Sequence, residues 1–393
     1  MAVAVVFGAS GISGWGITKA LLDAKTQNAF SKIIALTNRS LSLAESGLPD
    51  DDRLQLHSGI DLQANVDDVI AKLRERIPSI GNVTHVFYTA FSTSHTDNQL
   101  MMKASNTKML RTMVEAMETV APSLSFIAVQ TGSNHYGILF AEVLGERFGP
   151  VPLKEDLPRL PSPLRDSLMF YAMADEMDEL SRGKSWKWCD IRPDMIVGYL
   201  PRPNSHSIAE SIGYYLAFHA YLTPGEEVPF PGSEAAWNAK FSLTGQGVLG
   251  NFNVHLACKN SIENGEAFNI ANKPFTTWAS LWPLLAGYWG LKGTAPVGHH
   301  GIPDAASWVL DNMDRVKGWE EKYSMKPGRL FKIPWRYFHW ALNMPFDRYL
   351  DLTRCEQTGF QQHEEHKESF ETAWKCMQEA KLLPIVDKSS TPP

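Results

Sequence analysis

Residues 8–14 read GASGISG, and this glycine-rich run limits the fold more than any other feature of the chain. It follows AVAVVF, an entirely apolar stretch that predicts a strand buried on both faces. The next segment, ISGWGITKALLDAK, is predicted to be a helix. A glycine turn between a buried strand and a helix is the arrangement that holds a dinucleotide pyrophosphate at a helix N-terminus. The flanking elements disfavour the alternative, a glycine turn that serves packing alone.

The small residues of this turn have separate expected roles. Gly8 would permit the tight turn, and Gly11 would let the backbone approach the pyrophosphate. Gly14 would allow the helix to pack closely on the strand. Ser10 leaves the turn uncluttered, and Ile12 opens the helix. We predict that all of these positions except Gly14 contact the cofactor.

The rest of the first half alternates short apolar, β-branched stretches with helical ones. Strands are predicted at 32–38, 52–59, 82–90, 124–132, 186–198 and 266–272, and helices at 62–76, 97–120 and 168–181. Strands that alternate with helices indicate a parallel sheet. We therefore predict an α/β fold with a Rossmann-type, doubly wound parallel sheet.

The later part of the chain has a different pattern. The proline-rich segment 150–166 predicts an extended loop, and beyond residue 200 proline, glycine and aromatic residues divide the chain into short pieces. The last 120 or so residues are predicted to be mostly helical. We expect residues 1–200 to form the NADP(H)-binding domain, with strand 266–272 returning to it, and residues 201–393 to form a mostly helical substrate-binding or lid portion.

The end of the second strand favours NADP(H) over NAD(H). An acidic residue there would bind the ribose 2′-hydroxyl, whereas an arginine accommodates a 2′-phosphate. The sequence has Asn38, Arg39 and Ser40, with no acid. The alternative is that Arg39 is a solvated surface side chain. Asp61 and Leu62, after the third strand, are placed to contact adenine.

Residues at the ends of the fourth and fifth strands complete the predicted dinucleotide site. Thr89 and Ala90 follow the fourth strand and should line the crevice, together with Phe91. Gln130 lies at the end of the fifth strand. No metal site is expected, because the four cysteines are far apart and none has C-x-x-C spacing.

Composition excludes several kinds of partner. The formal net charge is −6 and there is no basic cluster, so nucleic-acid binding is not expected. The N-terminus lacks the basic start of a secretory signal, and no stretch has the ~18 uninterrupted apolar residues of a membrane span. We expect a cytoplasmic protein, without membrane or nucleic-acid partners, that binds a hydrophobic small molecule. A homodimer is compatible with the sequence.

Several motifs together resemble a known family. They are GASGISG, FYTAFST, NTKMLRTMVEAM, VQTGSNHYG, FYAMADEM, IRPDMIVG, EAFNIAN and GFQQHEEHKESFETAW. In this order they resemble the progesterone 5β-reductase/iridoid synthase-like family, an atypical branch of the extended short-chain dehydrogenases/reductases, and its fungal members most. The resemblance covers nearly the whole chain. It implies NADPH-dependent reduction of the C=C bond of an enone or enal.

The resemblance also implies catalytic residues. The superfamily pattern Y-x-x-x-K is not expected in this family. Asp175, four residues after Tyr171, therefore does not argue against a catalytic role of Tyr171. Tyr171 takes the position of the tyrosine that stabilises the developing enolate oxygen, an oxyanion-type role. The family's lysine belongs to a T-G-x-K-H-Y motif, which here reads TGSNHY and has Asn134 at the lysine position. Asn134 cannot supply a charge, but it could bind the nicotinamide ribose or orient Tyr171. His135 beside it could assist, although a structural role is favoured for it.

The family's loop that holds the nicotinamide carboxamide corresponds to Pro193 through Ile196. Tyr171 could also be a core aromatic, because Met169, Phe170 and Met173 give its helix an apolar stripe.

Three functions remain open. The first is an NADPH-dependent ene-reductase or carbonyl reductase of secondary metabolism. The second, suggested by Asn134, is an isomerase, cyclase or aldol-type enzyme that retains NADP(H) without redox chemistry. The third is a cofactor-sensing regulatory protein, which the presence of Tyr171 disfavours.

Overall fold

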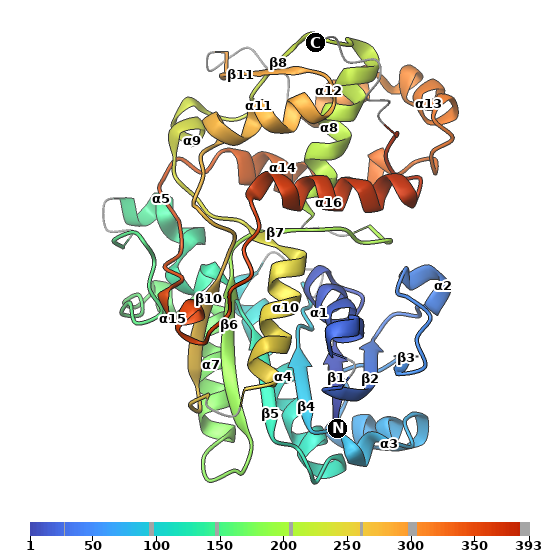
Figure 1. The fold of residues 1–393 in the computed structure, drawn as a ribbon. Coiled ribbons are helices and arrows are strands. Elements are labelled where there is room, and N and C mark those ends of the chain that lie inside the picture. The colour runs from blue at the N-terminus through green and yellow to red at the C-terminus, as the bar shows by residue number, and fades with distance from the viewer. Residues whose placement is uncertain are drawn as a thin grey trace. The chain divides into compact units, whose positions relative to one another are not determined.

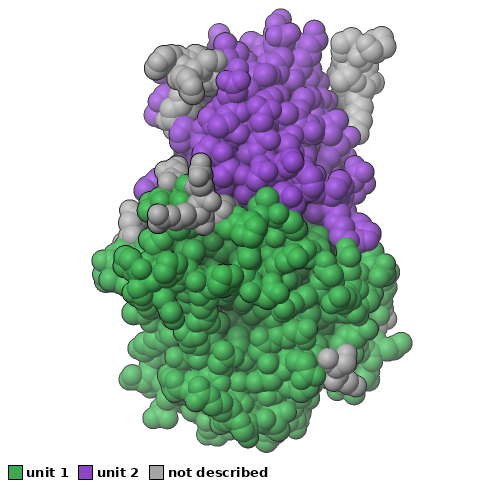
Figure 2. All heavy atoms as spheres, turned by 90° about the vertical axis from the view of Figure 1, so that its left-hand side faces the viewer, with its two compact units in different colours: residues 1–194, 247–271, 350–362 green, residues 195–246, 272–349, 363–393 purple. Residues whose placement is uncertain are grey.

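The computed structural model describes residues 1–26, 28–93, 98–145, 149–203, 207–259, 262–297 and 305–385. The chain divides into two compact units, which are coloured separately in Figure 2. The first unit contains residues 1–194, 247–271 and 350–362. The second contains residues 195–246, 272–349 and 363–393. Of the predicted returning strand 266–272, residues 266–271 belong to the first unit, within its segment 247–271, whereas Asn272 belongs to the second unit.

The first unit is built on a seven-stranded parallel sheet (Figure 1) with strand order β10-β6-β5-β4-β1-β2-β3. Its strands are β1 (Ala2–Phe7), β2 (Phe30–Thr37), β3 (Leu54–Ser58), β4 (His85–Tyr88), β5 (Phe126–Gln130), β6 (Lys187–Pro193) and β10 (Glu266–Ile270). The order reverses direction between β1 and β4, and ligands of such sheets bind beyond the carboxyl ends of the strands at this switch point. The predicted Rossmann-type fold is confirmed.

Helices cover both faces of this sheet. The helices that lie wholly or almost wholly in the first unit are α1 (Ile12–Leu22), α2 (Leu43–Ser46), α3 (Val66–Arg76), α4 (Gln99–Val120), α5 (Ala141–Leu144), α6 (Leu164–Ser167), α7 (Met169–Leu180), α10 (Gln246–Ala257) and α15 (Thr353–Gln357). Short 3₁₀ turns lie at η1 (Ala24–Thr26), η2 (Ile80–Asn82), η3 (Ser133–Tyr136) and η4 (Ile138–Phe140).

The alternation of side chains along β1 decides which helices cover each face. Val3, Val5 and Phe7 lie in one core cluster with apolar residues of α3, α4 and α7. On the other face α1 and α10 lie side by side, and a Cβ at Gly250 would stand only 2.5 Å from the Gly16 carbonyl oxygen. Because both faces are covered, β1 is buried from Val3 onward, as its uninterrupted apolar sequence predicts.

The second unit is mostly helical, as predicted. Its helices are α8 (Ile208–Leu222), α9 (Glu234–Asn238), α11 (Trp278–Tyr288), α12 (Ala305–Asp311), α13 (Met313–Lys322), α14 (Trp335–Leu342) and α16 (His366–Glu379), with a 3₁₀ turn η6 (Leu330–Lys332). Two small parallel pairs join β7 (Ile196–Val197) to β9 (Thr244–Gly245) and β8 (Glu227–Pro229) to β11 (Lys292–Thr294).

Aromatic residues form much of the interior of the second unit around α8. The ring of Tyr215 lies 5.4 Å from those of Trp308 and Phe338, measured between centroids. The buried indole of Trp374 donates to the Ala209 carbonyl oxygen at 2.8 Å. The abundance of Trp and Phe in the later half of the sequence thus builds a core.

Two sequence predictions differ from the structure in detail. The stretch 186–198, predicted as a strand running into a proline turn, contains β6, which ends at Pro193, and also a second strand, β7, which pairs with β9 of the second unit. The segment 150–166 is an extended loop as predicted, apart from the short helix α6 at its end.

Candidate active site

The glycine turn joins the end of β1 to the start of α1 with almost no spare space. Gly8 has φ +86°, and a Cβ there would stand 2.8 Å from the backbone nitrogen of Ala90. A Cβ at Gly14 would stand 2.3 Å from the Gly8 carbonyl oxygen. These two glycines therefore bring the turn against the end of β4, which is the neighbouring strand at the switch point.

The beginning of α1 is open where the sequence predicts the pyrophosphate. Gly11 is the N-cap and offers no side-chain cap, and a Cβ there would meet only the Gly8 carbonyl oxygen, at 3.4 Å. The first N–H groups of a helix have no partner within the helix and attract anions. Ser10 is half-buried beside them, and Ile12 is buried at the first helical position.

Exposed polar residues follow β2. Asn38, Arg39 and Ser40 are all exposed, and the Arg39 guanidinium has no ion-pair partner in the part of the chain that the structure describes. The Thr37 hydroxyl donates to the Arg39 carbonyl oxygen at 2.7 Å and so fixes the backbone of this turn. The arginine side chain is thus accessible to a ligand phosphate.

Asp61 and Leu62 follow β3 with different surroundings. One carboxylate oxygen of Asp61 accepts from the Gln63 N–H at 3.0 Å and from the Asn38 side-chain amide at 3.4 Å. This contact joins the loops after β2 and β3. Leu62 is buried in the core cluster, so only its backbone is available to a ligand.

At the ends of β4 and β5 the side chains tie neighbouring elements together. The Thr89 hydroxyl donates to the Phe7 carbonyl oxygen at 2.9 Å, and Ala90 stands over Gly8. The Gln130 side-chain amide donates to the Ser13 hydroxyl at 2.6 Å. Its carbonyl oxygen, Oε1, is buried with no hydrogen-bond partner among the described residues.

The residues of this edge fit a dinucleotide. A glycine cradle without side chains, a helix N-terminus and an accessible arginine match the needs of a pyrophosphate and a further phosphate. The buried Oε1 of Gln130 is an acceptor that a ligand donor would satisfy, because orphaned buried acceptors are costly.

Tyr171 is buried in α7 with its hydroxyl engaged. Its Oη accepts a hydrogen bond from the Leu160 backbone N–H at 3.0 Å. The core cluster, as far as the structure describes it, takes Met173 and Met177 from the same helix and leaves Tyr171 outside. Burial raises the pKa of Tyr171, partly offset by the Leu160 hydrogen bond and the charge of Arg159. At neutral pH the phenol is protonated and its hydrogen is free to be donated.

His135 lies against Tyr171. The two ring centroids are 4.8 Å apart in an edge-to-face arrangement. Burial lowers the pKa of His135 to about 3, with Arg192 contributing in the same direction. The imidazole is therefore neutral at physiological pH, and its Nδ1 has no partner among the described residues.

Asn134 has a local structural contact. Its side-chain oxygen accepts from the Leu139 backbone N–H at 3.2 Å, and its carbonyl oxygen accepts from Gly137 at 3.0 Å. The side chain thus stabilises the turn between η3 and η4. The predicted roles at the nicotinamide ribose or at Tyr171 stay predictions.

The predicted carboxamide loop begins where β6 ends. Pro193 is the last residue of β6 in the first unit, and Ile196 is the first residue of β7 in the second unit. Asp194 between them accepts from the Ser133 hydroxyl at 2.9 Å, which ties this loop to η3.

A buried polar network beneath η3 was not predicted from the sequence. Asp190 pairs with Arg192 at 2.7 Å and accepts from the Thr131 hydroxyl at 2.5 Å. The Tyr136 hydroxyl donates to the Asn269 side chain at 2.5 Å. Burial alone would lower the pKa of Arg192, but the Asp190 carboxylate raises it above its ordinary value. The alternation of polar Asp190 and Arg192 within an apolar strand was the available signal.

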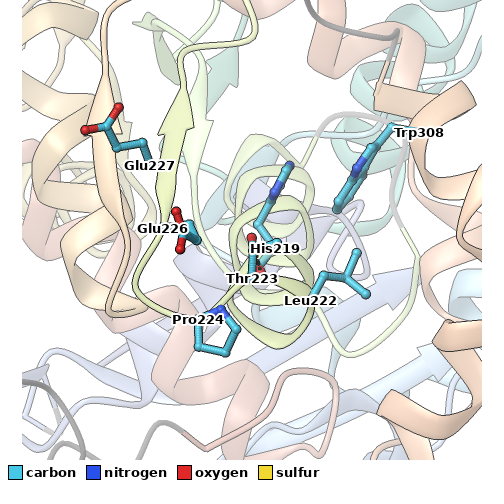
Figure 3. A pocket seen from close by; sticks show the side chains of 7 residues that line it. All are labelled: His219, Leu222, Thr223, Pro224, Glu226, Glu227 and Trp308. Atoms are coloured by element: carbon cyan, nitrogen blue, oxygen red, sulfur yellow. Dashed lines mark hydrogen bonds between the residues drawn. The ribbon is translucent and has the colours of Figure 1, made fainter.

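A cavity of about 530 Å³ lies elsewhere, in the second unit (Figure 3). The stacked rings of His219 and Trp308, with centroids 4.0 Å apart, line it together with Glu226 and Glu227. None of the predicted site residues lines this cavity.

Comparison with known proteins places the chain in a family over nearly its whole length. The family described as PRISE-like Rossmann-fold domain matches residues 4–384. Short chain dehydrogenase sirR of Leptosphaeria maculans is 36% identical over 398 aligned residues, which cover 98% of each chain. The 3-oxo-Delta(4,5)-steroid 5-beta-reductase of Arabidopsis thaliana is 27% identical over 323 residues, 81% of this chain and 76% of the relative.

The solved structure of the Bordetella bronchiseptica enzyme WbmH in complex with NAD+ is similar with a TM-score of 0.58. It is 14% identical and covers 96% of this chain and 99% of its own, so this likeness shows the fold alone.

Fold, glycine turn and relatives together define an oxidoreductase of the short-chain dehydrogenase/reductase class. Enzymes of this class use a nicotinamide dinucleotide. Within the class, the chain belongs to the PRISE-like Rossmann-fold family, which confirms the resemblance seen in its motifs. No helix in the described part of the chain has the length and apolar character needed to cross a membrane.

Proposed function

We propose that the protein is an NADPH-dependent ene-reductase that reduces the C=C bond of an enone or enal in a hydrophobic small molecule of secondary metabolism. The observation that carries this proposal is the state of Tyr171. Its phenol is buried and protonated, and its oxygen already accepts from Leu160, so its O–H remains available to donate.

A bound reduced nicotinamide would supply the hydride to the β-carbon of the substrate. As negative charge develops on the substrate carbonyl oxygen, Tyr171 donates a hydrogen bond to it, and this donor stabilises the transition state more than the ground state. His135 is neutral, so it orients the phenol ring by contact rather than as an imidazolium.

The choice of NADPH over NADH rests on Arg39. It is exposed after β2, no acidic residue occurs among residues 38–40, and its guanidinium can form charge-assisted hydrogen bonds to a 2′-phosphate.

The proposal of a hydrophobic substrate is supported by apolar side chains on the segment after η3. Leu160, which contacts Tyr171 through its backbone, packs close to Gly137, and Leu139 and Val143 on the segment after η3 are exposed at 46% and 76%. Sites for apolar ligands are lined mostly by apolar side chains with a few polar groups. The prediction that residues 201–393 form the substrate-binding or lid portion stays a prediction.

The experiment is to follow NADPH absorbance with a panel of enones, enals and saturated ketones, using the full-length protein and Tyr171→Phe. We expect an enone or enal to be reduced, and Tyr171→Phe to lower kcat roughly 10²- to 10³-fold. Tyr323→Phe, at an exposed tyrosine of the second unit, is the matched control and should leave kcat unchanged. Reduction that persists undiminished in Tyr171→Phe would remove Tyr171 from the mechanism.

The non-redox alternative has its own signature. An isomerase or cyclase that retains NADP(H) would bind NADPH and convert an enone or dialdehyde without consuming the cofactor. Product analysis of the same panel by mass spectrometry distinguishes the two, because reduction adds two hydrogens and isomerisation adds none.

A further inference from the structure

The charge that a lysine would provide beside Tyr171 has another source in this chain. The guanidinium carbon of Arg159 lies over the face of the Tyr171 ring, 4.9 Å from its centroid. The next residue, Leu160, donates its backbone N–H to the phenol oxygen at 3.0 Å. Two adjacent residues of the proline-rich loop therefore contact both the face and the oxygen of the same side chain.

Asp175 holds the guanidinium in this place. Its carboxylate pairs with Arg159 Nη1 at 2.5 Å. Asp175 stands four residues after Tyr171, so the two side chains lie on the same face of α7, one turn apart. The lysine position of the superfamily's Y-x-x-x-K pattern thus contains the anionic partner of a cation supplied by a different segment.

We propose that Arg159 is a positioning residue for Tyr171, held over the phenol by Asp175, and that it replaces the missing lysine of the TGSNHY motif. The inference deepens the proposed function and rests on it for the identity of the reaction, but the charge acts on Tyr171 whether or not substrate is present.

Arg159 is close enough to the Tyr171 ring for its charge to shift the pKa of the phenol measurably. An opposite charge within about 4–6 Å shifts a pKa by roughly 1–3 units when it is partly shielded from water. The Arg159 side chain is 31% exposed whereas Asp175 is 59% exposed, so solvent screens the carboxylate more than the guanidinium. The Arg159 charge lowers the pKa of Tyr171, so this guanidinium favours charge development on the phenol oxygen.

Other groups around Tyr171 act on it as well. Burial raises the pKa of Tyr171, and Arg192 of β6 and Arg165 of α6 lower it together with Arg159. His135 is neutral near pH 7. Among the described cations, Arg159 lies over the ring. Arg165 is exposed on the neighbouring helix α6, so its substitution is the control for that of Arg159.

Proline residues restrict the loop that presents Arg159. Pro158 and Pro161 flank the Arg159–Leu160 pair, and Pro161 limits the backbone of Leu160, the residue before it. The N–H that contacts the Tyr171 oxygen thus comes from a residue with few alternative backbone conformations.

The test is a ¹⁹F NMR titration of full-length protein in which tyrosine is replaced by 3-fluorotyrosine. The ring fluorine lowers phenol pKa values, which keeps the titration within the folded range. The Tyr171 signal is assigned by its absence in Tyr171→Phe. Variants are Arg159→Met, Arg159→Lys and, as the matched control, Arg165→Met.

We expect Arg159→Met to raise the pKa of Tyr171 by roughly one unit, Arg159→Lys to recover most of the shift, and Arg165→Met to change it far less. Enone reduction should follow the same order, with kcat down about tenfold in Arg159→Met, a change that matches a one-unit shift, and with KM nearly constant.

An unchanged Tyr171 titration in Arg159→Met would overturn the inference even if the enzyme reduces enones. A shifted titration in a protein that reduces no enone would support the charge at Tyr171 and reject the proposed reaction.

Discussion

At the residue scale, we propose that one exposed side chain, Arg39, selects the cofactor. It follows β2, at the position where an acidic residue would favour NADH, and the backbone beneath it is fixed by the Thr37 hydroxyl. A flexible arginine on a fixed turn can close on a 2′-phosphate without rearranging the sheet.

The substitution Arg39→Ala should therefore raise the KM for NADPH roughly 10- to 100-fold, because a charge-assisted hydrogen bond contributes about 1.5–3 kcal/mol. The KM for NADH should change little. Steady-state kinetics with both cofactors measures the difference, and Arg74→Ala, at an exposed arginine of α3, is the control. Equal losses for NADPH and NADH would contradict the role of Arg39.

Asn134 illustrates a residue whose type alone is ambiguous. In sequence it stands at a lysine position and suggests a lost catalytic charge. In the structure its side chain accepts from Leu139 and holds a turn, a contact that an ammonium group cannot make because it has no acceptor.

At the scale of elements, the turn η3 is held from below by polar residues of neighbouring strands. Asp190 and Arg192 lie on β6, Asn269 on β10 and Tyr136 on η3 itself. Arg192 also donates to the Glu155 carbonyl oxygen at 3.2 Å, so the proline-rich loop joins the same network. The network thus fixes η3, which contains His135, and the proline-rich loop before α7 in position on the sheet.

Breaking this network should be costly. Asp190→Asn leaves the buried Arg192 charge without its anion, and we expect the free energy of unfolding to fall by about 3–5 kcal/mol. Urea denaturation measures it. In the control Glu321→Gln the lost pair, Lys317–Glu321, is exposed on α13, and the change should be at most about 0.5 kcal/mol. Similar losses of unfolding free energy in both variants would mean that the buried pair stabilises the fold no more than the exposed pair does.

At the scale of the molecule, the two units are interleaved in sequence. The chain passes from one unit to the other after residues 194, 246, 271, 349 and 362. Strand β10 pairs with β6 although α8, α9 and α10 lie between them in sequence, so many contacts of the first unit join distant parts of the chain.

Both units bury a histidine that is neutral when folded. Burial lowers the pKa of His135 to about 3 and that of His366 to about 4, from an ordinary value of 6.5. Between these values the unfolded chain binds more protons than the folded one, so stability is complete above about pH 6.5 and is lost as the pH falls toward 4. Each such group can contribute up to about 1.4 kcal/mol per pH unit across this window.

Urea midpoints measured from pH 7 to pH 4.5 should therefore decline for the wild-type protein and decline less for His366→Gln. The glutamine amide can still donate to the Pro274 carbonyl oxygen, which His366 Nε2 contacts at 2.8 Å. His363→Gln, at an exposed position on the same segment, should behave as wild type. A decline in His366→Gln as steep as in the wild type would assign the acid sensitivity to other groups.

The sequence by itself determined the elements whose signals are local. An apolar strand, a glycine turn and a helix in succession predict the nucleotide-binding edge, because side-chain periodicity and backbone freedom act over a few residues. The parallel sheet followed from the alternation of such segments, and the family motifs predict a catalytic role for Tyr171.

Only the tertiary structure decided how residues from separate segments meet. Arg159 and Tyr171 are twelve positions apart, and Tyr136 and Asn269 lie on elements separated by more than a hundred residues. No local pattern encodes such contacts, since they depend on how the whole sheet twists and on which loops cross its edge. For that reason the missing lysine was visible in the sequence, whereas the arginine beside the phenol became visible only in the fold.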